Sequence, residues 1–247
     1  MRFAGGRMLT VITPTSDRPL AVQLCAHQMT RQTITEPVEW VIADDGTSHV
    51  DTPGPPGPNW TVRHIRCAPL AAGKPRVWSF LGNLRAAFAA ASHDKIAIVE
   101  DDDWYASDWL AWCVAQLGED CAIVGESHSR YYDIQRRRYR QLHNVNHASL
   151  CSTAVTGRLR DWFEMRTDPT RRADWKVDID LWRCNVPKKL YRGNRVVGLK
   201  CLPGSRGLGS GHGRMSATMT ADPDGRVLRQ WIGDAADQYL TLHKDGA

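Results

Sequence analysis

The stretch Ile96-Ala97-Ile98-Val99 runs directly into Glu100-Asp101-Asp102-Asp103. The apolar, partly β-branched first part predicts a short buried strand. Four adjacent carboxylates repel one another, so such a cluster is tolerated only when it is solvated or neutralised by a cation. Carboxylate oxygens are the ligands that Mg²⁺ and Mn²⁺ prefer. The stretch therefore predicts a strand that ends in a metal site; the alternative is a solvated acidic turn that leads into a helix.

Strand and helix patterns alternate upstream of this stretch. Apolar runs predict strands at 9–13, 38–43 and 60–65, and helical spacing of apolar residues predicts helices that begin at Pro19 and cover 77–88. A further helix, capped by Ser107, is expected after the acidic residues. This alternation is typical of a doubly wound, mostly parallel sheet, in which ligands bind at the carboxyl ends of the strands. The polar segments that follow three of the strands are expected to meet in one crevice: 13–18, 44–47 and 100–103.

After residue 120 the predicted elements become shorter. Strands are expected at 121–124, 130–134, 139–142, 149–155 and 195–202, helices near 158–166 and 177–184, and one terminal amphipathic helix over 226–243. The segment 203–213 holds five glycines and matches neither the P-loop nor the dinucleotide-binding fingerprint. Its glycines allow close backbone approach, so Arg206 and His212 could meet a phosphate or a metal; the alternative is a glycine loop with an incidental histidine.

The composition is that of an ordinary globular protein. The 247 residues are 42% hydrophobic and 24% charged, which excludes disordered and collagen-like chains. The apolar runs are far shorter than the ~18–20 residues that cross a bilayer, and the N-terminal run is too short for a secretory signal. We therefore expect no integral membrane association and a cytoplasmic location. Seven scattered cysteines without a C-x-x-C pair argue against a disulfide framework, and we expect them to be reduced and mostly buried.

The formal charge of +5 is distributed unevenly. Residues 1–129 hold 10 basic and 15 acidic side chains (−5), residues 130–214 hold 19 and 7 (+12), and residues 215–247 hold 3 and 5 (−2). The middle segment contains the runs Arg136-Arg137-Arg138-Tyr139-Arg140 and Lys188-Lys189-Leu190-Tyr191-Arg192. A basic segment with interleaved aromatic residues is what a polyanionic partner favours, because phosphate contacts dominate such affinities.

Four stretches, in this order along the chain, carry a family resemblance: Leu9-Thr10-Val11-Ile12-Thr13-Pro14-Thr15-Ser16-Asp17-Arg18-Pro19, Val41-Ile42-Ala43-Asp44-Asp45-Gly46-Thr47, Ile98-Val99-Glu100-Asp101-Asp102-Asp103-Trp104, and Val177-Asp178-Ile179-Asp180-Leu181-Trp182. Together they resemble family-2 glycosyltransferases with the GT-A fold. The C-terminal third of the chain matches that pattern poorly. The resemblance implies an α/β fold with a mixed, mostly parallel central sheet flanked by helices. It also implies a single catalytic domain over 1–247, with a nucleotide-sugar-binding half at 1–120 and an acceptor-binding half with a C-terminal helix at 121–247.

The same resemblance implies roles for individual residues. Asp178 matches the catalytic base, although Val177 stands where the family usually has Glu. Asp102 matches the best metal ligand, and Asp101 could take its place in an offset register. The implied sets are, for the nucleotide sugar, Thr13, Pro14, Thr15, Arg18, Asp44, Asp45, Asp101 and Arg206; for Mn²⁺ or Mg²⁺, Asp102, Glu100, Asp103 and His212; and for the acceptor, Arg136, Arg137, Arg138, Arg140 and Trp175. Plain structural alternatives stay open, with Asp44 as a turn residue, Arg18 as a surface charge and Asp178 as a helix N-terminal acid.

The implied activity is metal-dependent, inverting transfer of a sugar from a nucleotide-diphosphate donor, most simply a UDP-sugar, to an acceptor hydroxyl. With the basic segment, the chain is similar to bacteriophage enzymes that glycosylate hydroxymethylated pyrimidines such as 5-hydroxymethylcytosine in DNA, which would place it in the host cytoplasm. One alternative is transfer to surface polysaccharide or lipid-linked sugar, where the basic face would meet anionic headgroups. Another is a non-enzymatic nucleic-acid-binding module, which leaves the acidic strand ends without a role.

Overall fold

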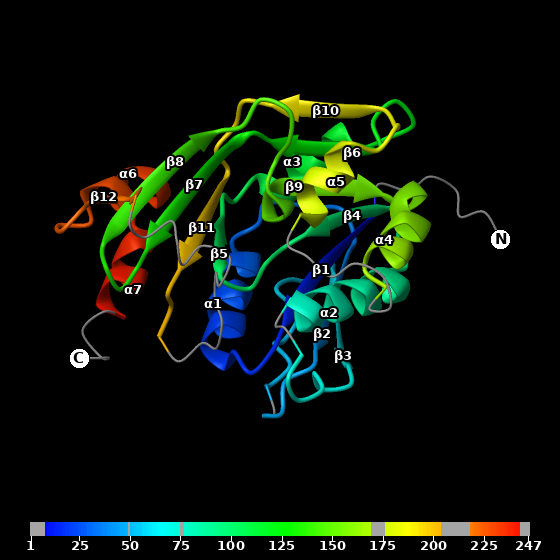
Figure 1. Cartoon of the computed structure of the whole chain (residues 1–247), viewed down its shortest axis with the longest axis horizontal. Helices are drawn as coiled ribbons and strands as arrows, with labels where there is room; N and C mark the ends of the chain where they lie inside the picture. The colour runs from blue at the N-terminus through cyan, green and yellow to red at the C-terminus, as the bar shows by residue number, and fades with distance from the viewer. Residues whose placement is uncertain (1–7, 49, 75–76, 169–175, 204–217, 243–247) are drawn as a thin grey trace.

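A seven-stranded sheet forms the centre of the computed structural model, which describes residues 8–48, 50–74, 77–168, 176–203 and 218–242 (Figure 1). The strand order is β10-β6-β9-β4-β1-β2-β3. Only β9 runs antiparallel to its neighbours β4 and β6, so the predicted mixed, mostly parallel sheet is confirmed. The strands are β1 (Leu9–Thr15), β2 (Val38–Asp44), β3 (Trp60–Arg66), β4 (Lys95–Ile98), β6 (Ile123–Glu126), β9 (Thr153–Thr156) and β10 (Lys188–Tyr191).

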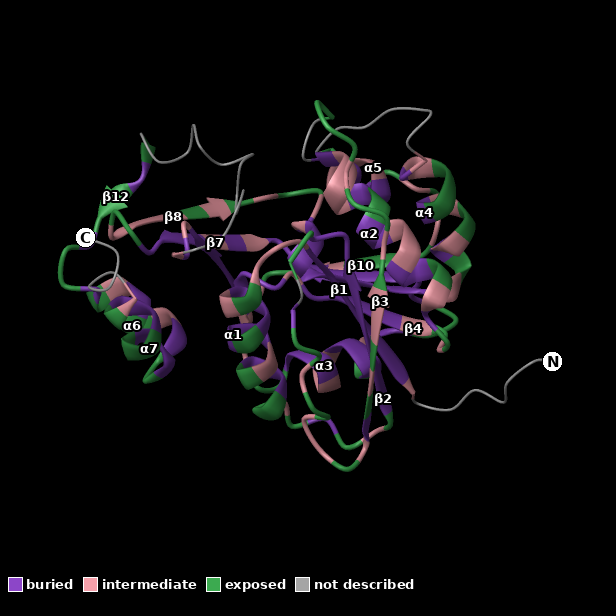
Figure 2. Cartoon of the chain, turned by 90° about the horizontal axis from the view of Figure 1, so that it is seen from below, coloured by how far each residue is buried: buried purple, intermediate pink, exposed green. Residues whose placement is uncertain are grey.

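Helices cover both faces of this sheet because its central strands are apolar on both sides. Leu9 and Val11 pack with α1 (Pro19–Thr30) and α3 (Trp109–Gln116), whereas Ile12 packs with α2 (Val77–Ala90), α4 (Arg160–Arg166) and α5 (Val177–Trp182). Two short 3₁₀ helices, Leu150–Ser152 and Gly157–Leu159, flank β9. The result is a three-layer α/β/α arrangement whose strands β1 and β2 are buried along most of their length (Figure 2).

A second, five-stranded sheet has the order β12-β8-β7-β11-β5. Its strands are β5 (Asp103–Tyr105), β7 (His128–Asp133), β8 (Arg138–His143), β11 (Val196–Lys200) and β12 (Thr220–Ala221). Strand β5 begins within the acidic turn, and Asp103 pairs with Gly198 of β11. Strand β11 is thereby brought against the acidic turn, although almost 100 residues separate the two along the chain.

The C-terminal helices pack against the second sheet and α1. One helix was expected over 226–243, but the structure has α6 (Arg226–Ile232) and α7 (Ala235–Thr241). Gly233, with φ of 61°, ends α6 in a conformation that side chains other than glycine rarely adopt. The expected cap Ser107 is also wrong, since α3 begins at Trp109 after Asp108, which makes no side-chain capping bond.

All seven cysteines are free, as predicted, and four of them are buried. Within the described ranges, no helix combines the length and the apolar character that a membrane crossing needs.

Candidate active site

The loop after β1 is tied to the acidic turn through Asp101. Thr15 Oγ1 donates to Asp101 Oδ2 at 2.6 Å, and Arg18 Nη1 donates to Asp101 Oδ1 at 2.8 Å. Burial opposes the charge of Arg18, but the acidic residues, Asp101 foremost, outweigh it and raise the pKa of Arg18. Three residues that the sequence assigns to the nucleotide sugar therefore meet at one point. Two others, Thr13 and Pro14, are buried within β1, and Thr13 Oγ1 accepts a hydrogen bond from Trp40 Nε1.

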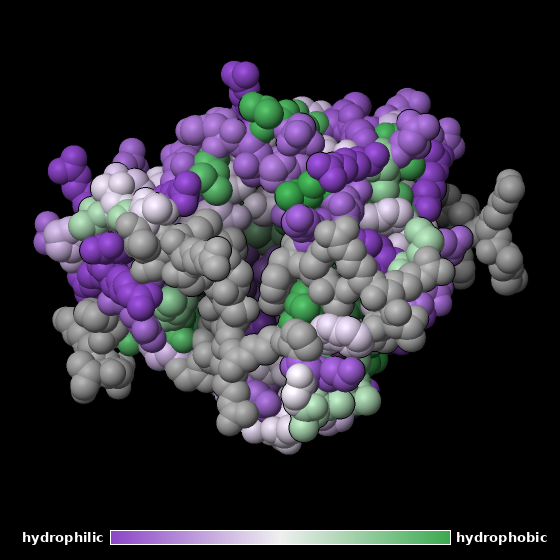
Figure 3. All heavy atoms as spheres, in the orientation of Figure 1, coloured by the Kyte–Doolittle hydropathy of each residue, from purple (hydrophilic) through white to green (hydrophobic). Residues whose placement is uncertain are grey.

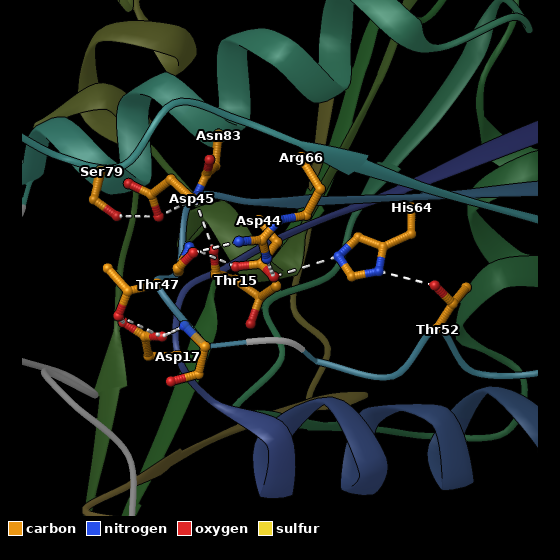
Figure 4. Close-up of polar contacts among 12 residues, drawn as sticks. Thr15, Asp17, Asp44, Asp45, Thr47, Thr52, His64, Arg66, Ser79 and Asn83 are labelled. Atoms are coloured by element: carbon orange, nitrogen blue, oxygen red, sulfur yellow. Dashed lines mark hydrogen bonds and ion pairs between the residues drawn. The ribbon is translucent and has the colours of Figure 1, made fainter.

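The loop after β2 is held by Asp44, whose carboxylate folds back on its own turn. Asp44 Oδ1 accepts a hydrogen bond from the Gly46 backbone N–H at 2.7 Å, and Arg66 binds both Asp44 Oδ2 and the Gly46 carbonyl (Figure 4). His64 Nε2 lies 3.4 Å from Asp44 Oδ2. A Cβ on Gly46 would lie 2.5 Å from the backbone nitrogen of Asp17, so only glycine fits there. The close approach of the two loops therefore depends on the Asp-Asp-Gly sequence.

Asp45 connects the same loop to helix α2. Its Oδ1 atom accepts hydrogen bonds from Ser79 Oγ and Asn83 Nδ2, both at 2.8 Å, and Asn83 Nδ2 also donates to the Thr15 carbonyl at 2.7 Å (Figure 4). Asn83 thus ties the carboxyl ends of β1 and β2 together. Sequence reasoning missed Asn83, Arg66 and His64. The available sequence signal for Asn83 was a lone asparagine on an otherwise apolar helix face, and this side chain is buried in the structure.

Lys200 is the fixed cation of the acidic turn, and the sequence analysis missed it as well. Its Nζ atom lies 3.0 Å from Asp103 Oδ1 and 3.3 Å from Asp102 Oδ2. Burial opposes the charge of the ammonium, but Asp102, Asp103 and Glu100 together raise the pKa of Lys200 well above its ordinary value. A lysine inside the apolar strand Val196–Lys200 was the signal that could have been read.

The carboxylates themselves are crowded and buried. Burial is the main cause that raises the pKa of Asp103 to about 6, with Asp102 adding to it and Lys200 opposing it. Burial likewise raises the pKa of Glu100 well above its ordinary value. Both carboxyls would ionise more readily if a further positive charge approached. The two cations Arg18 and Lys200 thus face four acidic residues, and a further cation would favour the ionised form of Glu100 and Asp103.

The oxygen donors of the acidic turn fit a divalent cation. Among the described residues, Glu100, Asp103 and Cys151 form the group whose ligand atoms all lie within 4.8 Å of one another. Burial raises the pKa of Cys151 well above its usual range, so the thiol stays protonated and is a poor ligand for Mg²⁺ or Mn²⁺. The hard ligands are the carboxylates of Glu100 and Asp103, with Asp102 on the intervening turn. The remaining expected ligand, His212, lies outside the described residues, as does Arg206.

Asp178 lies in the first turn of α5. Val177, Leu181 and Trp182 are buried and fix this short helix against the core. Asp178 Oδ1 accepts a hydrogen bond from the Ile179 backbone N–H at 2.7 Å. Burial raises the pKa of Asp178, and nearby His147 acts in the opposite direction. Across the described part of the chain, no hydrogen bond or ion pair joins Asp178 to the acidic turn.

The arginines expected at the acceptor lie on the β7–β8 hairpin. Arg136 pairs with Asp133 at 3.1 Å, Arg137 donates to the Pro223 and Leu240 carbonyls, and Arg140 Nη1 donates to Thr218 Oγ1 at 2.7 Å. Arg138 lies in β8. The hairpin extends toward α6 and β12, whereas α5 lies beside α4 on the other side of the molecule in both views (Figures 1 and 2). Trp175, also expected at the acceptor, is outside the described residues.

Comparison with known proteins gives the fold its name. No protein-family model and no curated protein matches the sequence. Among solved structures, the mannosyltransferase PcManGT from Pyrobaculum calidifontis, in complex with GDP-Man and Mn²⁺, aligns over 96% of this chain and 73% of its own, with 15% identity and a TM-score of 0.53. S. aureus TarS 1-349 in complex with UDP-GlcNAc aligns over 96% and 71%, with 13% identity and a TM-score of 0.50.

A longer TarS structure aligns with only 49% of this chain at a TM-score of 0.36, and the chain spans about a fifth (21%) of that protein's length. Identities this low establish a shared fold and nothing finer. The α/β architecture, the mixed sheet order and the alignments with PcManGT and TarS 1-349 agree with the fold that the sequence motifs imply: the chain has the GT-A fold.

Proposed function

We propose that this protein is a metal-dependent, inverting glycosyltransferase that uses a nucleotide-diphosphate sugar. The observation that carries the proposal is the convergence of three strand ends on one acidic site. Thr15 and Arg18 bind Asp101, Asn83 links Thr15 to Asp45, and the four acidic residues of the turn face two cations. A site of this kind suits a divalent cation and the diphosphate that the cation accompanies.

The residues at the ends of β1, β2 and β4 would bind the donor. Glu100, Asp102 and Asp103 would hold the divalent cation, which supplies charge neutralisation for the departing diphosphate when it is bound. Arg18 would place a second positive charge beside the same group. Asp44 and Asp45 shape the loop after β2, where the nucleoside would lie. No role in the chemistry is needed for Thr13 and Pro14, which belong to the buried strand.

Asp178 would act as the general base. Its Oδ1 atom accepts a hydrogen bond from the Ile179 N–H, which orients the carboxylate, and Oδ2 would take the proton from the acceptor hydroxyl. The raised pKa of Asp178 makes it a stronger base than an ordinary aspartate. As the proton moves to Oδ2, the hydroxyl oxygen bonds to the anomeric carbon and the bond to the diphosphate breaks on the opposite face. A single displacement of this kind inverts the anomeric configuration.

A transfer assay tests this proposal. Purified protein is incubated with UDP-, GDP- and dTDP-sugars, each with Mn²⁺, Mg²⁺ or EDTA, and release of the nucleoside diphosphate is followed with a panel of acceptors. We expect release with one nucleotide class, stimulated by the divalent cation. Failure of every nucleotide sugar to bind in calorimetry, with Mn²⁺ present, would contradict the proposal.

For the acceptor, we propose a polyanion, with DNA that carries hydroxymethylated pyrimidines as the favoured member. The +12 charge of residues 130–214 supports this choice. Lys188, Lys189 and Arg192 are exposed on and beside β10, and Figure 3 shows hydrophilic side chains across the upper part of the face over β8 and β10. The turn of the β7–β8 hairpin points away from α5 (Figures 1 and 2), so a polymer is suited to contact both.

Mass spectrometry distinguishes the acceptors. DNA with 5-hydroxymethylcytosine, unmodified DNA and an undecaprenyl-linked acceptor are each incubated with the donor that the first assay identifies. A mass increase equal to one sugar on the modified DNA alone is the expected result. Transfer only to the lipid-linked acceptor would favour the surface-polysaccharide alternative. An active enzyme that leaves modified DNA unchanged would exclude the DNA acceptor.

A further inference from the structure

The ammonium group of Lys200 lies against two carboxylates that are expected to bind a metal ion. Its Nζ atom is within 3.3 Å of an oxygen of Asp102 and within 3.0 Å of an oxygen of Asp103. The side chain is only 8% exposed. The charge is thus not an incidental surface ion pair but a permanent part of the acidic turn, although the family resemblance did not point to this residue.

The position of Lys200 is fixed by the second sheet. Strand β11 pairs with β5 on one side and with β7 on the other, and Lys200 itself pairs with Asp133. The Lys200 carbonyl accepts a hydrogen bond from the Ile134 N–H, and the Asp103 carboxylate accepts one from the Leu199 N–H at 3.2 Å. Both the ammonium and one of its carboxylate partners are therefore held in register by backbone pairing.

The ammonium uses only part of each carboxylate. It contacts Asp102 through Oδ2 and Asp103 through Oδ1, while Arg18 and Thr15 take both oxygens of Asp101. Arg18 and Lys200 offset half of the charge of the four acidic residues when all of these are ionised. A divalent cation that approaches the remaining oxygens must therefore share two carboxylates with a positive charge that cannot leave.

We propose that Lys200 is a resident counter-cation of the donor site, which weakens the binding of a divalent metal on its own and supplies part of the positive charge that holds the donor diphosphate. This inference rests on the proposed function, because it assumes a nucleotide diphosphate as the ligand. It predicts a protein that binds Mn²⁺ poorly without nucleotide and that keeps measurable affinity for a nucleoside diphosphate without metal.

The experiment measures two affinities in Lys200→Met and Lys200→Gln. The glutamine keeps hydrogen-bond donors for Asp102 and Asp103 but has no charge. Arg31→Met, which removes an exposed positive charge just after α1, is the control. Mn²⁺ binding to the metal-free protein is followed by electron paramagnetic resonance. Binding of UDP and of GDP is followed by calorimetry, in EDTA and with saturating Mn²⁺.

In both Lys200 variants we expect Mn²⁺ alone to bind about tenfold more tightly, because two buried carboxylates lose their competing cation. We expect the nucleoside diphosphate to bind about tenfold more weakly in EDTA, with little change at saturating Mn²⁺ and no change in the control. If the ion pair were purely structural, its loss in the variants would lower their thermal stability and leave the Mn²⁺ affinity unchanged or weaker. That result would overturn the inference.

Two further outcomes keep the test decisive. If neither variant folds, the wild-type protein decides: nucleoside diphosphate binding that disappears in EDTA overturns the inference, and binding that persists supports it. If neither UDP nor GDP binds wild type even with Mn²⁺, the proposed function fails, whereas the Mn²⁺ affinities of the variants still decide the role of Lys200.

Discussion

Each carboxylate at the carboxyl ends of the central strands has a different set of partners. Both oxygens of Asp101 accept hydrogen bonds, from Thr15 and Arg18, so Asp101 joins the acidic turn to the loop after β1. It is therefore less available to a metal than Asp102. The oxygens of Asp44 accept hydrogen bonds from the Gly46 N–H and from Arg66. Among the described residues, Asp178 accepts its side-chain hydrogen bond through Oδ1, from the Ile179 N–H. A partly buried carboxylate with a raised pKa is the group best suited to take a proton, which makes Asp178 the sharpest residue to test.

Replacement of Asp178 by asparagine should lower kcat/KM by about 10²–10⁴, because the side chain keeps its shape but can no longer accept a proton. The pKa of Asp178 is raised above 3.8 by burial, so wild-type activity should fall as the pH drops through that raised value. The part of the acidic limb that Asp178 causes should be absent in Asp178→Asn, whereas the part that Asp103 causes, with its pKa of about 6, should remain. Activity is measured from pH 4.5 to 8, with nucleotide affinity followed by calorimetry.

Asp180→Asn is the matched control for this prediction. Asp180 lies on the same helix and pairs with Arg166 at 3.0 Å, so its loss should affect stability. The acidic limb of the activity profile should remain but move to slightly lower pH, because the charge of Asp180 contributes to the raised pKa of Asp178. Equal pH profiles in wild type and Asp178→Asn, or full activity in the latter, would remove Asp178 from the role of base.

The acidic members of the site could be predicted from sequence, whereas their partners could not. Strand ends and acidic residues are local features, so the sequence predicts that Asp45 and Asp101 lie near one another, and hydrogen bonds through Asn83 and Thr15 link their loops. Lys200 meets Asp103 only because β11 inserts between β5 and β7, and Arg66 reaches Asp44 only because β3 lies beside β2. Such partners depend on the order of strands in a sheet, which a single sequence does not encode locally.

Among the elements, those with a clear apolar pattern were predicted, short strands such as β4 and β6 included, and the strands β5, β10 and β12 were missed. The strands β1 and β2 and the helices α1 and α2 carry strong apolar patterns, and their expected positions are confirmed within a few residues. Strand β10 carries Lys188 and Lys189 at a sheet edge, where polar residues are tolerated and the pattern is weak. Strand β12 has only two residues, and β5 has no apolar pattern of its own because it begins inside the acidic turn.

Glu39 shows how a single polar residue joins several elements below the site. From within β2, its carboxylate accepts hydrogen bonds from Thr10 Oγ1 on β1, from Arg63 Nη1 on β3, and from the backbone N–H and Oγ of Ser92, at 2.7 to 2.9 Å. Burial alone would raise the pKa of Glu39, but these hydrogen bonds outweigh burial and lower it.

Glu39→Gln should lower the free energy of unfolding by about 1–3 kcal/mol at pH 7, because the amide cannot accept all four bonds of this buried carboxylate and loses the ion pair with Arg63. Since the folded pKa is depressed, the stabilisation is complete above the unfolded value near 4.5 and is lost as the pH falls through the folded value. The difference between wild type and variant should therefore shrink at pH 3.5. Urea denaturation at both pH values measures it.

Glu164→Gln provides the comparison, because its exposed ion pair with Arg85 should contribute at most about 1 kcal/mol. A loss in Glu39→Gln no larger than that in Glu164→Gln, or one that grows as the pH falls, would show that the carboxylate of Glu39 does not hold β1, β2 and β3 together.

Across the whole molecule, the two signs of charge are segregated along the chain. The segment 1–129 carries −5 and contains the acidic turn, whereas 130–214 carries +12 and contributes β7, β8 and β10. The structure qualifies this picture. Arg137 is engaged with two backbone carbonyls that tie the hairpin to the C-terminal region, so part of the basic charge serves the fold rather than a partner. Arg136, with a side chain 58% exposed, is better placed to meet a polyanion.

Salt dependence tests the polyanion at this scale. Each phosphate contact lowers the logarithm of the DNA affinity by about 0.7–0.9 per logarithm of salt concentration, because bound counterions are released. Arg136→Ala/Arg138→Ala should therefore reduce the magnitude of that slope by about 2 and weaken modified and unmodified DNA alike. Arg31→Ala/Arg85→Ala removes the same charge from the residue after α1 and from α2, and should leave the slope unchanged. The slopes are measured by fluorescence anisotropy over roughly 50 to 300 mM salt, the range in which they are resolved. Equal slopes in the two double variants would mean that net charge rather than the β7–β8 hairpin attracts the DNA.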